Sequence, residues 1–220
     1  MDNRHDILQL LRQVADGSAT PEEALSRLKR EPFEDLGYAK VDFHRGVRQG
    51  AAEVIYGAGK TPEQIAGIAA TMGARGCQNI LITRLAPAAA ELVAKAVPLD
   101  YHPIPRAAIA CPGARKAMGH IVVATGGTSD MPVAEEAALT AEVLGNKVTR
   151  LYDVGVAGLH RLLANLEPLM NARCVIAVAG MEGALASVVG GLVDCPVVAV
   201  PTSVGYGASF GGLSALLAML

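Results

Sequence analysis

Four apolar segments recur at regular spacing in the second half of the chain, and they constrain its fold more than any other feature. They begin at residues 121, 148, 174 and 197, so successive starts are 27, 26 and 23 residues apart. Helix-type patterns lie between them: residues 159–166 and 185–192 each carry leucine or valine along one helix face. This alternation predicts right-handed crossovers and a parallel sheet covered on both sides. We therefore predict an α/β fold, a three-layer sandwich with a mainly parallel sheet.

The first half of the chain predicts smaller elements. Two short helices precede residue 31, and the second begins at a capping box in which Thr20 caps and Glu23 reaches back. Residues 31–50 are polar and predict irregular structure. Strands are predicted at 53–57 and 79–85, and helices at 61–76, after a second capping box at Thr61, and at 87–96. The four prolines of residues 98–119 predict a connection that holds another short strand.

We place the domain boundary between residues 117 and 118. Residues 1–117 then form a helical and small α/β region, and residues 118–220 form the larger α/β domain.

Composition excludes several classes of protein. The net charge is −2 and the sequence has no Lys/Arg stripe, so we predict no nucleic-acid partner. The apolar region from residue 174 is broken by glycine and proline at strand-like lengths, which argues against a membrane span. It holds so few charges that we expect subunit contacts to cover part of it. The four cysteines form no C-x-x-C pair and no signal peptide is present, so we expect reduced thiols in a cytoplasmic protein.

Glycine and small polar residues follow each of the four regular strands. These segments are TGGTSD (125–130), DVGVAG (153–158), AGMEG (179–183) and PTSVGYG (201–207). Parallel strands end at one edge of the sheet, where ligands of open α/β proteins bind, and the helix N-termini there favour anions. We therefore expect a small molecule that carries phosphate. The alternative for the first segment is a simple turn, capped by Ser129 or Asp130.

Several single residues allow two interpretations. Glu182 lies in a nearly uncharged segment, either as a sheltered acid/base or metal ligand or as compensation for a helix dipole. Asp153 is a ribose ligand or a turn former. His160 has a structural or a functional role on its helix. Cys195 is a buried, inert thiol or, as a weaker alternative, a nucleophile.

Three long motifs resemble the LarB family, the carboxylase/hydrolases that open nickel-pincer nucleotide cofactor biosynthesis. They are GGTSDMPVAEEAA, YDVGVAGLHRL and AGMEGALASVVGGLVDCPVVAVPTSVGYG, and the resemblance extends to residues 42–61 and 82–85. The C-terminal half is also similar in pattern to the aminoimidazole ribonucleotide carboxylases. The resemblance implies a PurE-like, flavodoxin-like version of the predicted fold and a homo-octamer.

The resemblance also implies a reaction. Nicotinic acid adenine dinucleotide would be carboxylated at pyridine C5 and its phosphoanhydride hydrolysed, which gives pyridinium-3,5-biscarboxylic acid mononucleotide and AMP. A cysteine thiolate adds to C4 of the ring, and the resulting dihydropyridine attacks CO2 through C5. CO2 or bicarbonate is the co-substrate, Mg²⁺ is expected to neutralise phosphate charge, and no organic cofactor is expected.

The resemblance assigns roles to individual positions. Asp130, Glu182 and His160 would be catalytic, and Asp130 and Glu182 would also hold the metal. The positions expected to bind substrate are Thr125, Gly126, Gly127, Thr128, Ser129, Asp153, Gly155, Gly158, Gly180, Met181, Thr202, Ser203, Gly205, Tyr206, Arg45 and Arg84.

Two departures keep other functions open. The related purine-pathway carboxylases carry a histidine where this chain has Leu185 or a neighbour. The nucleophilic cysteine of the LarB family follows the helix that here ends at Leu220, so we expect it just beyond that residue, in a C-terminal segment that this domain lacks. None of Cys77, Cys111 and Cys174 matches its motif, nor does Cys195. The alternatives are an aminoimidazole ribonucleotide carboxylase or mutase, and a non-catalytic nucleotide-binding module.

Overall fold

The computed structural model describes residues 3–28, 33–43, 45, 53–114 and 117–220. The chain divides into two compact units: unit 1 comprises Met1–His102 and Ala107–Gly113, and unit 2 comprises Pro103–Arg106 and Ala114–Leu220. The boundary predicted between 117 and 118 stays a prediction. Within the described ranges no helix is long and apolar enough to cross a membrane.

Unit 1 begins with the helices α1 (Asn3–Ala15) and α2 (Pro21–Leu28). The capping box predicted at Thr20 is confirmed: the hydroxyl of Thr20 accepts the N–H of Glu23 at 3.1 Å, and the carboxylate of Glu23 accepts the N–H of Thr20 at 2.9 Å. An antiparallel hairpin follows, β1 (Phe33–Asp35) with β2 (Lys40–Asp42). The prediction of irregular structure for residues 31–50 is therefore wrong for 33–42, because polar residues can pair in an exposed two-stranded ribbon. Within that stretch, residues 31, 32, 44 and 46–50 lie outside the described residues.

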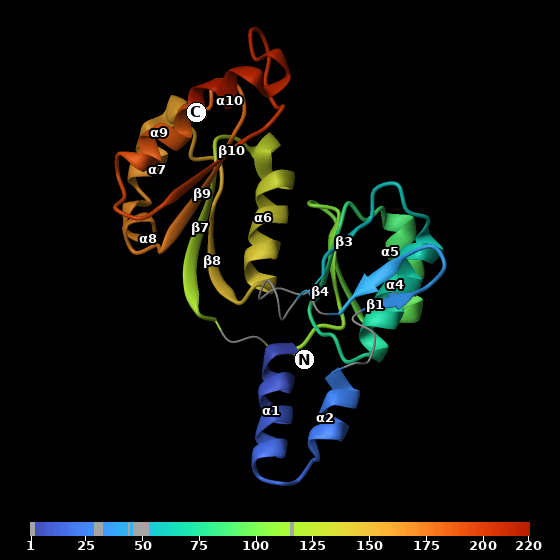
Figure 1. Ribbon diagram of the computed structural model, residues 1–220. Coiled ribbons are helices and arrows are strands. Elements are labelled where there is room, and N and C mark those ends of the chain that lie inside the picture. Colours follow the sequence, from blue (N-terminus) through green and yellow to red (C-terminus); the bar gives the residue numbers. More distant parts are fainter. Residues whose placement is uncertain (1–2, 29–32, 44, 46–52, 115–116) are drawn as a thin grey trace. The chain divides into compact units, whose positions relative to one another are not determined.

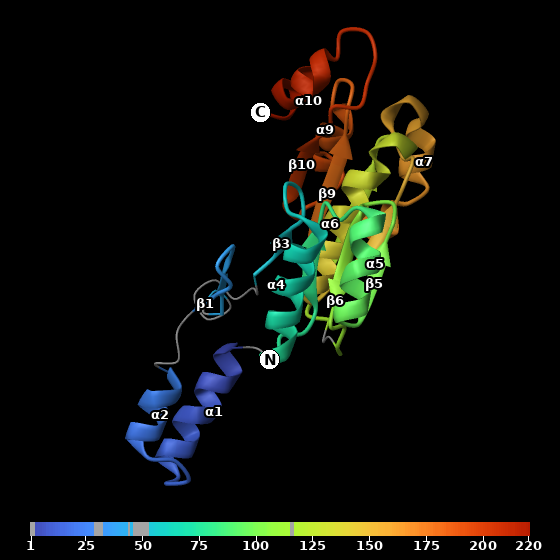
Figure 2. The ribbon, with the colours of Figure 1, turned by 90° about the vertical axis from the view of Figure 1, so that its right-hand side faces the viewer.

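The main sheet of unit 1 is mixed, in the order β3-β4-β6-β5. Its strands are β3 (Ile55–Tyr56), β4 (Ile80–Thr83), β5 (Leu99–His102) and β6 (Ala107–Ala110), of which only β3 and β4 are parallel neighbours. The helices α4 (Pro62–Ala74) and α5 (Pro87–Ala96) pack on one face of this sheet through Ile65, Met72 and Val93 (Figure 2). The capping box at Thr61 is also confirmed. The region 98–119 holds both β5 and β6, where one short strand was predicted.

Unit 2 is the predicted three-layer sandwich. Its sheet has the order β10-β9-β7-β8, and every neighbouring pair is parallel. The strands are β7 (Gly119–Thr125), β8 (Asn146–Leu151), β9 (Cys174–Ala179) and β10 (Val197–Pro201). Short 3-10 helices, η1 (Thr128–Asp130), η2 (Val156–Gly158) and η3 (Phe210–Gly212), follow three of them.

Helices cover both faces of this sheet (Figure 1). On one face α6 (Met131–Val143) buries Ala134 and Ala138 against Val123 and Val178. On the other face lie α7 (Leu159–Leu163), α8 (Leu166–Met170) and α9 (Ala184–Gly190). The helical pattern over 159–166 is thus divided into two short helices. The last helix is α10 (Leu213–Met219).

Candidate functional site

The strand order of unit 2 reverses between β7 and β9. The chain passes from β7 to β8 on one side, then returns to β9 and β10 on the other. In open α/β sheets, ligands bind outside the carboxyl ends of the strands at such a point. Here the backbone N–H of Gly126 donates to the carbonyl of Val178 at 3.0 Å, and a Cβ at Gly126 would lie 3.5 Å from the Cβ of Ala179. The loops after β7 and β9 are therefore in direct contact at the predicted binding edge, which we call the carboxyl edge.

The loop after β8 is bound to the end of β7. Thr125 is fully buried, and its hydroxyl accepts the N–H of Asp153 at 3.0 Å while its carbonyl accepts the N–H of Val154 at 3.0 Å. A Cβ at Gly155 would lie only 2.4 Å from the carbonyl oxygen of Gly126. This position therefore requires glycine for steric reasons.

The loops after β9 and β10 are joined in the same way. The N–H of Met181 donates to the carbonyl of Val204 at 2.9 Å, and the N–H of Thr202 donates to the carbonyl of Ala179 at 3.1 Å. A Cβ at Gly180 would lie 2.0 Å from the carbonyl oxygen of Val204. All four loops of the carboxyl edge are therefore packed against a neighbour.

Two residues of this edge have backbone conformations that are unfavourable for their side chains. Asp153 and Met181 have φ values of 56° and 53°, in the left-handed region that glycine prefers. Each lies just beyond the end of a strand of unit 2. Such conformations persist only where surrounding structure enforces them, and they concentrate at functional sites.

The side chains of the edge fall into two groups. Thr125, Asp130 and Thr202 are buried. The exposed side chains are those of Thr128, Ser129, Asp153, Met181, Glu182, Ser203 and Tyr206, and the backbone of Gly205 is exposed as well. Because η1 begins at Thr128 and leads directly into α6, which begins at Met131, backbone N–H groups and two hydroxyls lie together at a helix N-terminus, where anions are favoured.

Asp130 has partners inside the protein for both carboxylate oxygens. One oxygen accepts the hydroxyl of Thr202 at 2.7 Å and the other accepts the N–H of Gly127 at 3.0 Å. Glu182 is exposed, and within the described ranges no three His, Cys, Asp or Glu side chains form a group that could hold a metal ion. These residues do not make a protein cage for Mg²⁺.

The remaining predicted positions lie elsewhere. His160 is exposed on α7, next to Arg161, whose guanidinium forms an ion pair with the carboxylate of Asp153. Arg161 also lies against Gly158, where a Cβ would be 2.7 Å from its Nε. Arg45 and Arg84 belong to unit 1, and Arg84 also has a left-handed backbone, with φ of 55° directly after β4.

Neither cysteine of unit 2 lies at the carboxyl edge. Cys174 and Cys195 are at the opposite, amino ends of β9 and β10, and Cys77 and Cys111 belong to unit 1. Burial raises the pKa of the Cys77, Cys111 and Cys174 thiols, which keeps them protonated and weakly nucleophilic.

Two contacts of this site could not be predicted from the sequence. The Thr202–Asp130 bond joins residues 72 positions apart, and no sequence pattern predicts it. The Asp153–Arg161 pair spans eight positions across a 3-10 turn, which removes the usual helical spacing signal. For the Asp153–Arg161 pair, the sequence offered one indication: Arg161 follows His160 in the YDVGVAGLHRL motif, which also contains Asp153.

Comparison with known proteins agrees with this arrangement. Residues 33–111 match the family model of the LarB/PurE-like N-terminal domain, and residues 120–220 match that of AIR carboxylase. The uncharacterized protein MJ0165 of Methanocaldococcus jannaschii is 34% identical over 227 residues, which cover 98% of this chain and 87% of that protein. Two domain matches in the same order and a full-length relative establish the family. The chain therefore belongs to the LarB-like proteins, in which a LarB/PurE-like N-terminal domain precedes an AIR carboxylase domain.

Proposed function

We propose that this protein carboxylates the pyridinium ring of nicotinic acid adenine dinucleotide at C5 and hydrolyses its phosphoanhydride, releasing pyridinium-3,5-biscarboxylic acid mononucleotide and AMP. The observation that carries the proposal is the switch point between β7 and β9, where the exposed Thr128 and Ser129 begin a helix. Backbone N–H groups and hydroxyls at this point suit the phosphate of a nucleotide. Family members are typically carboxylases, which supports a carboxylation on such a substrate.

The exposed side chains suggest a division of roles. The carboxylate of Asp153 can accept hydrogen bonds from ribose hydroxyls, and Arg161 holds it in place. Glu182, exposed two positions after Gly180, is the better of the two predicted carboxylates to accept the C5 proton, because Asp130 is buried and each of its oxygens already accepts a hydrogen bond. Loss of that proton restores the aromatic ring and expels the thiolate that had added to C4.

The position of α10 supports a nucleophile that follows this helix. A Cβ at Gly183 would lie 3.1 Å from the Cε of Met219 and 3.1 Å from the Cα of Ala215. The end of α10 therefore packs beside the start of α9, close to the loop that carries Glu182. A family cysteine just beyond Leu220 would be near the carboxyl edge, whereas Cys195 lies at the far end of its strand.

The purine-pathway alternative has less support from the geometry. The AIR carboxylase match favours it. However, Leu185 is buried at 2% exposure in the core between α9 and the sheet, so the position that resembles the catalytic histidine of those enzymes supplies core packing instead. An imidazole is absent there, which favours the thiolate route.

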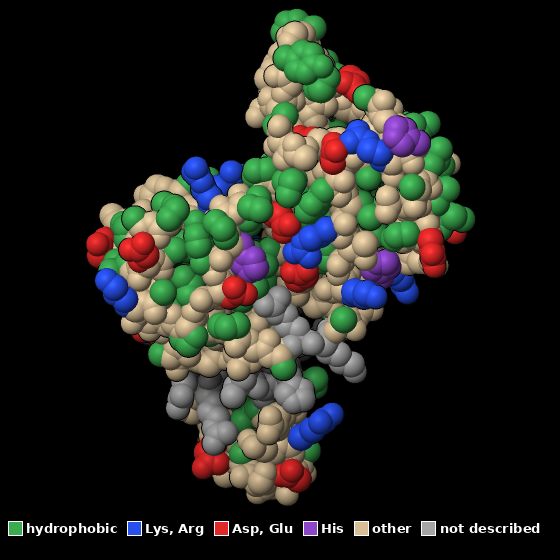
Figure 3. All heavy atoms as spheres, turned by 180° about the vertical axis from the view of Figure 1, so that it is seen from behind, with side chains coloured by type: hydrophobic (Ala, Val, Ile, Leu, Met, Phe, Trp, Pro, Cys, Tyr) green, Lys and Arg blue, Asp and Glu red, His purple; other side chains and the backbone are tan. Residues whose placement is uncertain are grey.

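We also propose that copies of this chain associate through the C-terminal region of unit 2. Residues 195–220 contain no Asp, Glu, Lys or Arg. Tyr206, Phe210 and Leu217 are 80%, 75% and 64% exposed, and apolar side chains gather on this projecting part (Figure 3). So much exposed apolar surface is typical of an interface. Sedimentation of the protein, compared with its Phe210→Glu variant, tests whether the assembly is an octamer.

The test of function uses the purified protein with nicotinic acid adenine dinucleotide and ¹³C-bicarbonate. We expect AMP and a mononucleotide that carries one ¹³C. Glu182→Gln is expected to lower the rate at least about a hundredfold, whereas Cys195→Ala leaves it unchanged. Carboxylation of aminoimidazole ribonucleotide instead would establish the purine-pathway alternative, and binding without turnover would establish a nucleotide-binding module.

A further inference from the structure

A buried carboxylate connects two loops that belong to non-adjacent strands. Asp130, 4% exposed, follows β7, and Thr202, 6% exposed, follows β10. The hydroxyl of Thr202 donates to one oxygen of Asp130, and the N–H of Gly127 donates to the other. Hydrogen bonds to an ionised acceptor are among the stronger ones in proteins.

This contact passes across the end of β9, because β9 lies between β10 and β7 in the sheet. A Cβ at Gly180, at the end of β9, would lie 2.7 Å from the hydroxyl oxygen of Thr202. The end of β9 is therefore enclosed by the Thr202–Asp130 bond. The carboxylate of Asp130 thus links the loops after β7 and β10 across the end of β9.

The orientation of Asp130 is unsuitable for direct chemistry. A general acid or a metal ligand needs an oxygen that can reach the substrate or the ion, and both oxygens here are directed to groups of the protein. The two residues just before Asp130, Thr128 and Ser129, are exposed. The turn closed by the bond between Asp130 and Gly127 is the one that presents them.

We propose that Asp130 and Thr202 are positioning residues: their bond holds the turn 126–130 in the conformation that presents Thr128 and Ser129 to a nucleotide phosphate. The ligand part of this proposal rests on the proposed function. The conformational part does not, because it concerns the protein without ligand. Thr202→Val keeps the shape of the side chain but leaves one oxygen of Asp130 buried without a donor, whereas Thr202→Ser keeps the donor.

The conformational part is tested by hydrogen exchange of the ligand-free protein. We expect amides of residues 126–131 to exchange about tenfold faster or more in Thr202→Val, and at the wild-type rate in Thr202→Ser. Thr140→Val is the matched control, because it removes a hydroxyl whose bond, to the carbonyl of Glu136, stays within α6. Unchanged exchange in Thr202→Val would overturn the proposal.

The ligand part is tested by kinetics with nicotinic acid adenine dinucleotide. Thr202→Val should raise KM about tenfold while kcat and its pH profile stay close to wild type, and Thr202→Ser should restore KM. A lost limb of the kcat pH profile in Asp130→Asn, with KM unchanged, would show a chemical role for Asp130 and refute the positioning role. If the wild-type protein does not bind this dinucleotide, the proposed function fails, while the exchange result still decides the conformational part.

Discussion

The hydroxyl of Thr125 holds the backbone of Asp153. Thr125 ends β7 and is fully buried, and it accepts the N–H of Asp153 in the left-handed turn after β8. Because Asp153 pays a conformational cost in that region, its partner stabilises a turn that would otherwise relax. The geometry of the ion pair between Asp153 and Arg161 therefore depends on a residue of another strand.

Replacement of Thr125 tests this dependence. Thr125→Val leaves the N–H of Asp153 without its acceptor, and we expect the free energy of unfolding to fall by about 1–3 kcal/mol. Thr125→Ser keeps the acceptor and loses one methyl group, with an expected cost of about 1 kcal/mol. Urea denaturation of both variants measures the difference. A Thr125→Val variant as stable as the wild type would show that this hydrogen bond does not stabilise the turn.

Substitution of Gly155 tests the contact between the loops after β7 and β8. Its φ of −61° suits any residue, so Gly155→Ala acts only through its Cβ, which would meet the carbonyl of Gly126. We expect a loss of about 1–3 kcal/mol in unfolding free energy, together with weaker nucleotide binding. Gly190→Ala is the control: nothing lies within 4 Å of a Cβ there, at the end of α9, and a gain of about 0.5 kcal/mol is expected. Similar behaviour of the two variants would contradict the steric argument.

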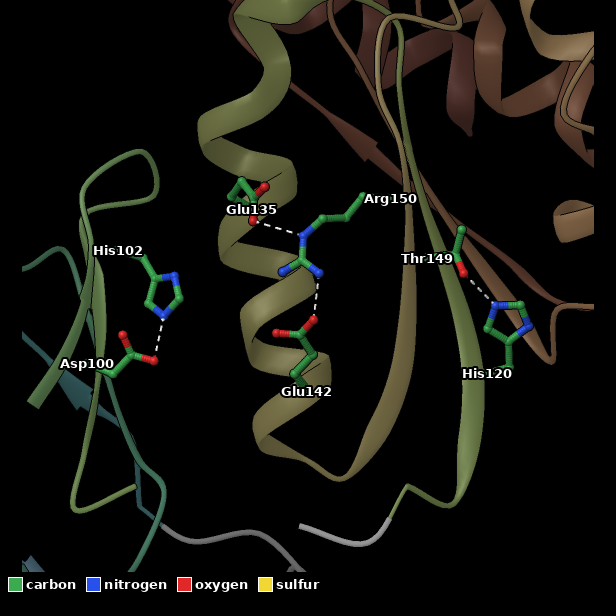
Figure 4. Close-up of polar contacts among 7 residues, drawn as sticks. All are labelled: Asp100, His102, His120, Glu135, Glu142, Thr149 and Arg150. Atoms are coloured by element: carbon green, nitrogen blue, oxygen red, sulfur yellow. Dashed lines mark hydrogen bonds and ion pairs between the residues drawn. The ribbon is translucent and has the colours of Figure 1, made fainter. Parts of the chain in front are cut away.

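Arg150 on β8 lies between two carboxylates of α6 (Figure 4). Its Nη1 is 2.5 Å from Glu142 and its Nε is 3.1 Å from Glu135, and these groups keep the pKa of Arg150 above its usual range. Because all three side chains are partly buried, the pairs should exceed typical surface salt bridges. Glu142→Gln is expected to lower the free energy of unfolding by about 1 kcal/mol. A double-mutant cycle with Arg150→Met measures the coupling energy between Glu142 and Arg150. The exposed Glu91→Gln serves as control, and a zero coupling energy would refute the interaction.

The ionisation of the Tyr152 phenol should make the stability of the protein depend on pH in the alkaline range. Burial, and secondly the nearby carboxylate of Glu135, raise the pKa of the Tyr152 phenol. A raised pKa in the folded state means that the folded protein holds this proton more tightly than the unfolded chain. The resulting stability is present below about pH 10, the unfolded value, and is lost as the pH rises above it. Between pH 8 and 11 the midpoint temperature of thermal unfolding should therefore fall less in Tyr152→Phe than in the wild-type protein. An equal fall in the two proteins would contradict this assignment.

The sequence by itself determined the layers of the fold. The spacing of the apolar segments, together with helical patterns between them, was sufficient to predict the parallel three-layer sandwich of unit 2, because strands covered on both sides must be apolar throughout. The capping boxes at Thr20 and Thr61 were also predictable, since their residues interact over three positions. The hairpin 33–42 was missed, because short exposed strands carry neither an apolar run nor a clear period.

Only the tertiary structure decided what each residue of the carboxyl edge does. The resemblance assigned Thr125, Thr202, Thr128 and Ser129 to substrate binding, and Asp130 to catalysis and the metal. In the structure Thr125, Asp130 and Thr202 form one group and Thr128 and Ser129 another. The fold buries the first three and exposes the other two. The physical reason is that burial and hydrogen-bond partners depend on which strands become neighbours. That order places residues 72 positions apart within 2.7 Å of each other, and no local pattern records it.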